Sequence, residues 1–188
     1  MKEVNGEPRS NKNFINDVKS ILEQARSNAY SAINQIMINA YWQIGKRIVE
    51  QEQYGANRAR YGEQILKQLS EALTKEYGKG FSVSYLKYFR RFYIEFPDLP
   101  KRQTRLSNLT WSHFQRVMRV ENPSARDYYL QEASTNSWSI RTLDRNISTL
   151  YYERLLVSGQ KDIVTSEMEK KTEIFQAEQY EFIKSPYV

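Results

Sequence analysis

The chain has 188 residues, of which 40% are hydrophobic, and its 28 lysines and arginines outnumber 22 aspartates and glutamates, for a net charge of +6. This length and composition allow one domain with a real core, with or without a tail. The absence of cysteine and the presence of one histidine exclude disulfides, thiol nucleophiles and zinc sites built from cysteines or several histidines, so we expect no metal and no cofactor.

The first elements in chain order are a polar segment and a very long helix. Residues 1–12 are expected to be disordered and lack the apolar centre of a signal peptide. From Asn13, the predicted N-cap, apolar residues recur every three or four positions to about Gln53, which predicts a helix of roughly 40 residues. Such a helix is either bent near residues 27–31, or it extends beyond its own domain and packs against a partner chain.

The next two helices are predicted over residues 60–77 and 82–96. Gly78 and Gly80 permit the tight turn between them, and Ser82 is a suitable N-cap for the second of the pair. Pro97 ends that helix. We interpret residues 60–96 as a helix-turn-helix-like unit, because two helices joined by a short glycine turn have this layout.

The later elements are also predicted to be helices. Ser112, with Gln115 three residues on, predicts a capped helix start, and Asn122-Pro123 predicts another helix that runs to about residue 134. Ser139 opens a helix whose apolar face extends to Tyr151, and the polar segment 158–188 is interpreted as a linker with some helix in it. No segment alternates as a strand would, so we predict an all-α helical bundle with a long N-terminal helix.

The positive charge is concentrated in one segment. Residues 57–105 hold 11 basic and 5 acidic groups, whereas residues 1–56 hold 7 and 6, residues 106–157 hold 6 and 5, and residues 158–188 hold 4 and 6. A localised excess of this kind indicates an anionic partner, and nucleic acid is the commonest one.

The helix predicted over residues 82–96 has two unlike faces. A helical wheel places Leu86, Phe89 and Phe92 on a core-facing stripe and basic and hydroxyl side chains opposite. In a helix-turn-helix, the second helix enters the major groove and the flanking cations contact phosphates. The candidate DNA-binding residues are therefore Ser84, Lys87, Tyr88, Arg90 and Arg91 on this helix, with Arg58, Arg60, Lys101 and Arg102 beside it. The alternative, that this basic face is simply solvated, stays open.

The sequence carries no catalytic pattern that we recognise. His113 has no serine or aspartate constellation around it in the sequence and is expected to have a structural or a surface role. Phosphate-binding glycine loops, serine hydrolase elbows and zinc protease motifs are absent. We therefore expect no catalytic residue and no small-molecule substrate in this chain.

Seven spaced segments resemble a known family. They are INQIMINAYWQIGKRIVE, YGEQILKQLSEAL, GKGFSVSYLKYFRRFY, LTWSHFQRVM, ARDYYLQEA, NSWSIRTLDRNI and YYERLL. In this order they resemble the N-terminal helical domain of the YhcG-type bacterial proteins, which carry a PD-(D/E)XK nuclease-like domain at the C-terminus. The resemblance implies a DNA-binding domain over residues 13–157, with residues 158–188 as a linker that ends where the family's nuclease-like domain begins.

Two functional hypotheses follow. In the first, the chain is the DNA-targeting part of a nuclease-family protein and binds duplex or branched DNA through the helix at 82–96. In the second, the long first helix makes the chain a homo-oligomerisation domain without direct nucleic-acid binding. The two are compatible, because helix-turn-helix proteins commonly bind as dimers, and we expect a homodimer. The lack of about 18 consecutive apolar residues predicts no membrane span, and we expect a cytoplasmic protein.

Overall fold

The computed structural model describes residues 9–53, 58–102 and 104–184. Every regular element within these residues is a helix, which confirms the predicted all-α class. The helices are α1 (Arg9–Gln53), α2 (Arg58–Tyr77), α3 (Val83–Glu95), α4 (Leu99–Arg102), α5 (Trp111–Val117), α6 (Pro123–Thr135), α7 (Ile140–Ser148), α8 (Tyr151–Val157) and α9 (Lys161–Lys184). None of these described helices is both long and apolar enough to cross a membrane.

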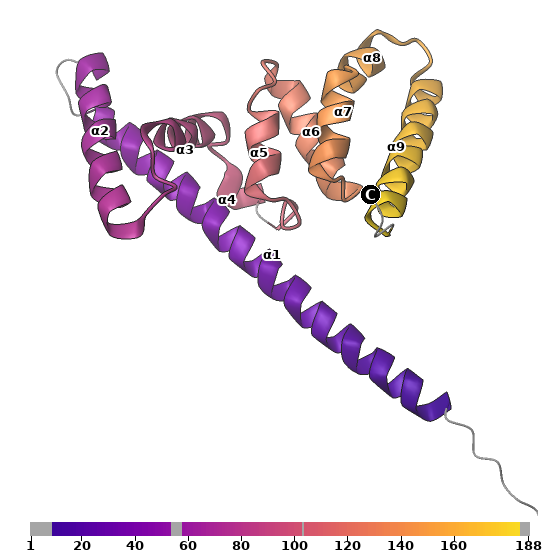
Figure 1. The fold of residues 1–188 in the computed structure, drawn as a ribbon. Coiled ribbons are helices and arrows are strands. Elements are labelled where there is room, and N and C mark those ends of the chain that lie inside the picture. The colour runs from indigo at the N-terminus through magenta and orange to yellow at the C-terminus, as the bar shows by residue number, and fades with distance from the viewer. Residues whose placement is uncertain (1–8, 54–57, 103, 185–188) are drawn as a thin grey trace, which may run out of the picture.

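The long helix α1 organises the molecule. It runs for 45 residues without a break at residues 27–31, and its N-terminal half extends past the other helices (Figure 1). The prediction of a long helix is confirmed, and of the two alternatives α1 takes the one in which the helix extends beyond its domain. The predicted N-cap at Asn13 is wrong: the backbone is already helical at Arg9, so Asn13 lies inside the helix.

The C-terminal half of α1 holds α3 at very short range. A Cβ on Gly45 would overlap the carbonyl oxygen of Phe89 and lie 2.7 Å from its carbonyl carbon, so only glycine permits this approach. The ring of Tyr41 stacks on that of Phe89 with centroids 4.4 Å apart, and the indole Nε1 of Trp42 donates a hydrogen bond of 2.8 Å to the carbonyl of Phe96. These contacts fix the position and the rotation of α3 on α1.

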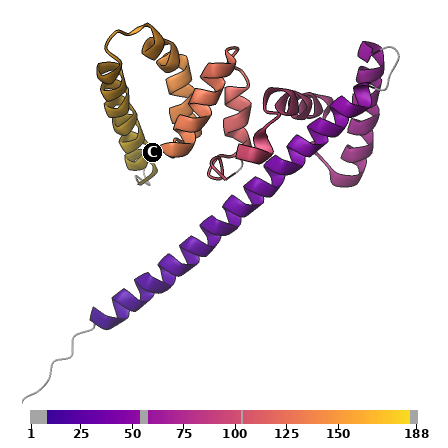
Figure 2. The ribbon, with the colours of Figure 1, turned by 180° about the vertical axis from the view of Figure 1, so that it is seen from behind.

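The main core lies between α3 and the group formed by α5 to α9, which stands beside α1–α3 (Figure 2). Phe92 and Phe114 meet edge to face with ring centroids 5.0 Å apart, and Tyr129 and Leu143 are fully buried. The segment that we interpreted as a linker with some helix contains α9, whose Met168 packs into this core.

Helix starts follow the predicted caps in three cases. Ser82 and Ser139 accept hydrogen bonds from backbone N–H groups of α3 and α7, and Asn122 accepts two from the first turn of α6, with Pro123 at the first helical position. These three predictions are confirmed, because a short polar side chain before an apolar run satisfies the free N–H groups of a first turn.

Two further local predictions are wrong. The cap of α5 is Thr110 rather than Ser112, with His113 instead of Gln115 completing the reciprocal bonds. The single face predicted from Ile140 to Tyr151 is interrupted, because Leu150 adopts a left-handed backbone (φ 53°) and separates α7 from α8. Leu150 is consequently exposed instead of packed.

Candidate nucleic-acid interface

The basic face belongs to α3, which follows α2 through the predicted glycine turn. Gly78 (φ 81°) and Gly80 (φ 132°) both adopt positive φ, which side chains other than glycine rarely accept. Leu86, Phe89 and Phe92 are buried, as the wheel predicts. The opposite face of α3 is therefore the one that is left for solvent or a ligand.

Three of the residues predicted on that face are exposed together. Ser84, Lys87 and Arg91 are exposed, and Lys87 and Arg91 lie one helical turn apart. Tyr88, which the wheel placed with them, is half-buried and packs against the main core cluster. The apolar stripe of α3 is therefore wider than the wheel predicts.

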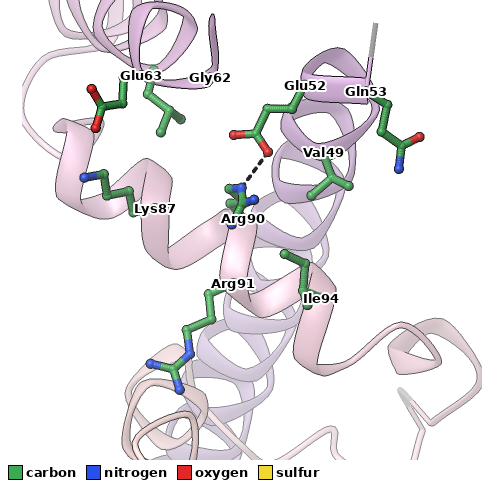
Figure 3. A pocket seen from close by; sticks show the side chains of 10 residues that line it. Val49, Glu52, Gln53, Gly62, Glu63, Lys87, Arg90, Arg91 and Ile94 are labelled. Atoms are coloured by element: carbon green, nitrogen blue, oxygen red, sulfur yellow. Dashed lines mark hydrogen bonds and ion pairs between the residues drawn. The ribbon is translucent and has the colours of Figure 1, made fainter. Parts of the chain in front are cut away.

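Arg90 is held by a carboxylate from α1. Its Nε donates to Glu52 Oε2 at 2.6 Å, as the dashed line in Figure 3 shows. Both side chains line a cleft of about 810 Å³ between α1, α2 and α3, together with Glu63, Lys87 and Arg91. The cleft has acidic as well as basic walls, and the guanidinium of Arg90 already has a partner there.

Arg91 belongs to a second ion-pair group. Its Nε lies 3.3 Å from Glu95 Oε1, one turn further along α3, and the other carboxylate oxygen of Glu95 pairs with Arg126 from α6. The side chain of Arg126 is only 10% exposed, whereas that of Arg91 is 45% exposed. The mostly buried guanidinium of Arg126 therefore neutralises Glu95. The exposed guanidinium of Arg91 can give up its ion pair with Glu95 at low cost in free energy.

The remaining predicted cations lie on α2 and α4. Lys101 Nζ is 3.2 Å from Asp98 and its side chain is 83% exposed, while Arg102 Nη1 donates to Asp127 Oδ1 at 2.8 Å. The backbones of Arg58 and Arg60 lie in the first turn of α2, and their side chains are outside the described residues.

The predicted cations differ in whether a carboxylate already pairs with them. Within the described part of the chain Lys87 has no ion pair, whereas Arg90, Arg91, Lys101 and Arg102 each have one. Surface ion pairs contribute only about 0–1 kcal/mol, so a phosphate can compete for the exposed cations. A phosphate competes less well for Arg90, whose carboxylate partner is mostly shielded from solvent.

Sequence reasoning missed the acidic partners of these cations. Glu52 and Asp127 come from helices far along the chain, and no local pattern connects them to Arg90 and Arg102. The Arg91–Glu95 and Lys101–Asp98 pairs did have a local signal, since their members are four and three residues apart.

His113 is placed as a structural residue. Its Nδ1 accepts a hydrogen bond from the backbone N–H of Thr110, and its Nε2 lies 3.0 Å from the carbonyl of Trp138. Burial lowers the pKa of His113, although the bond to the Trp138 carbonyl acts in the opposite direction. Across the described ranges, no cluster of three or more histidines or carboxylates is suited to a metal ion.

Comparison with known proteins identifies the family. Residues 17–154 match the family model described as the DUF1016 N-terminal domain. The chain belongs to this family. It is also 34% identical, over 170 residues, to the Escherichia coli (strain K12) protein named "Putative nuclease YhcG". That alignment covers 75% of this chain and 45% of the relative, so the chain spans less than half of the YhcG protein's length.

The resemblance to the YhcG-type N-terminal domain is therefore confirmed, and this chain is a DUF1016 N-terminal domain related to a nuclease-family protein. No solved structure matches it. The family match covers α3 and its neighbours from Asp17 to Arg154, so the basic face lies inside the shared domain.

Proposed function

We propose that this DUF1016 N-terminal domain binds duplex DNA through the exposed face of α3. The observation that carries the proposal is the pair Lys87 and Arg91, exposed one turn apart on a helix that follows a glycine turn, with the hydroxyl of Ser84 beside them. Lysine and arginine contact phosphates and guanine edges, and a serine hydroxyl bonds phosphate oxygens.

Charge and family support the same reading. The segment 57–105 holds 11 basic against 5 acidic residues, and α3 lies within it. The relative is named "Putative nuclease YhcG", and nuclease activity needs a nucleic acid held in place. In this proposal α3 supplies the phosphate contacts, Lys101 adds a further one from α4, and Arg90 positions α3 through Glu52 instead of contacting DNA.

The test is a salt titration of duplex binding by fluorescence anisotropy. The parent chain is compared with the double variant Lys87→Gln/Arg91→Gln and with a charge-matched control, Arg119→Gln/Arg141→Gln, which changes two exposed arginines outside α3. Each lost phosphate contact lowers the slope of log affinity against log salt by about 0.9, so the double variant should lose about 1.8 from the slope.

The outcomes separate cleanly. Weaker binding and a shallower salt slope for the α3 variant alone support the proposal. Equal losses in both variants would indicate that net charge matters and the α3 face does not, and an absence of binding by the parent at low salt would refute DNA binding. Branched and single-stranded DNA in the same assay give the structural preference.

A further inference from the structure

The N-terminal half of α1 carries an apolar stripe that no part of the described chain covers. Phe14 is 64% exposed and Ile21 67% exposed, and Figure 1 shows this half of α1 standing away from the other helices. The exposed apolar side chains on the stripe are Phe14, Ile15, Val18, Ile21, Leu22, Ile33 and Ile36. We name this set, with Ala25, Ala29 and Ala32 between its members, the α1 stripe.

The spacing of the α1 stripe is that of a helix that pairs with another helix. Ile15, Leu22, Ala29 and Ile36 recur every seven residues, and Val18, Ala25 and Ala32 do the same with an offset of three. Steps that alternate between three and four residues keep a seam facing one partner, and they are typical of coiled coils when sustained over three or more heptads.

The rest of the described fold lies on the other side of α1. We call the N-terminal half of α1 the arm. Ser20 and Ser27 lie roughly five helical turns before Ile38 and Gly45, so the polar face of the arm is on the side of α1 that contacts α3. The stripe is on the other side. By the same count Leu22 lies in line with Ala40, which lines an apolar groove of about 630 Å³ between α1 and α2.

The arm also needs a partner in order to stay helical. Its polar face is rich in serine and asparagine, at Ser20, Ser27, Ser31 and Asn34, which are mediocre helix formers, beside the better helix formers Glu23 and Gln24. Helical stability in proteins comes mostly from packing of an apolar face, and here that face is open.

We propose that the α1 stripe binds the α1 stripe of a second copy of this chain. The seven exposed apolar side chains offer on the order of 800 Å², about the area that each partner buries in a standard interface. The stripe carries no charge on its seam, and it is complementary to itself in size. In an antiparallel pair, large residues meet alanines of the second copy: Ile15 meets Ala32, Val18 meets Ala29, and Leu22 meets Ala25.

The flanks of the stripe give the pairing a distinctive salt response. Lys19 and Arg26 border the seam, and in the pair these cations approach their counterparts in the second copy. Salt screens this repulsion, so self-association should strengthen as salt rises. DNA binding through α3 should weaken under the same conditions, so the two proposals can fail independently.

The first experiment measures mass by sedimentation equilibrium without DNA. The parent chain is expected to be mostly dimeric at about 100 µM, and Val18→Glu/Leu22→Glu should weaken the dimer at least about 100-fold, because the carboxylates would have to lose their hydration in the apolar seam. The matched control Ser20→Glu/Ser27→Glu adds the same charge to the opposite face and should keep the dimer. A parent that is monomeric, or a control as impaired as the test variant, would overturn the proposal.

The second experiment uses the absence of cysteine from the chain. Ala25→Cys places one thiol near the middle of the paired stripe, and a short bismaleimide should link two copies through it. Ser27→Cys, on the polar face at the same height, should not be linked. Because neither position contacts the other helices, circular dichroism should show both variants folded, and equal linking of the two would refute the pairing.

Discussion

Gly45 offers the sharpest test of how α3 is positioned. Replacement by alanine would place a Cβ in overlap with the carbonyl oxygen of Phe89, 2.7 Å from its carbonyl carbon and 3.1 Å from Tyr93 Cβ. A backbone carbonyl inside a helix cannot rotate away, so α1 and α3 would have to separate. This separation would disturb the stacked pair Tyr41–Phe89 and the buried Leu86.

The expected magnitude follows from two opposing effects. Overpacking a tight contact costs typically about 1–3 kcal/mol, and more where the backbone must shift. Alanine in a helix interior contributes about 1 kcal/mol relative to glycine. With the backbone clash at the upper end of that range, Gly45→Ala should lower the free energy of unfolding by about 2 kcal/mol, which for a chain of this size lowers Tm by about 4–8 °C.

Thermal and urea denaturation followed by circular dichroism would measure the change. Gly62→Ala is the matched control, because Gly62 also lies within a helix, but the atoms nearest its Cβ belong to the side chain of Glu52, at 3.0 Å or more, and not to a backbone. That variant should be as stable as the parent or more so. If Gly45→Ala unfolds at the same temperature as Gly62→Ala, the close contact between α1 and α3 is not what holds α3 in place.

Three further predictions concern buried polar groups. Arg126→Gln removes the buried partner of Glu95 and should lower the free energy of unfolding, measured by urea denaturation, by about 3 kcal/mol. As a control, Lys101→Gln breaks an exposed ion pair and should change this free energy by less than about 0.5 kcal/mol. Tyr129→Phe removes a buried hydroxyl that accepts a hydrogen bond from a backbone N–H, and it should lower the free energy of unfolding by about 1–2 kcal/mol. Burial also raises the pKa of Tyr129 to about 12. An ultraviolet titration in which every tyrosine of the folded chain ionised near pH 10 would contradict this buried environment. Burial lowers the pKa of His113, so as pH falls the unfolded chain protonates His113 before the folded chain does. The Tm of the parent should therefore decrease below about pH 6.5. If the parent and a His113→Gln variant showed the same dependence of Tm on pH, this prediction would be wrong.

Several local features could be predicted because their causes are local. The period of apolar residues in α1, α2 and α3 predicts each helix, and Ser82, Ser139 and Asn122 predict three helix starts. The cap of α5 could not be chosen this way, since Thr110 and Ser112 are both suitable. His113 decides it, because its ring bonds both Thr110 and the Trp138 carbonyl, 25 residues away.

In the candidate site, too, local sequence predicts some features and only tertiary contacts decide others. A helical wheel was enough to place Lys87 and Arg91 on a face opposite Phe89, since that depends only on 3.6 residues per turn. It could not show that Arg90 meets Glu52 from α1, because the pair forms only when two helices are brought together.

The amino-acid sequence by itself determined that this protein is helical, where three of its helices begin, and which segment holds the positive charge, because propensity, capping and composition act over one or two turns. Only the tertiary structure decided which cations of that segment are neutralised and which apolar face of α1 is left open. Both depend on which distant helices touch, and the contact that sets the geometry, Gly45 against Phe89, joins residues far apart in the chain.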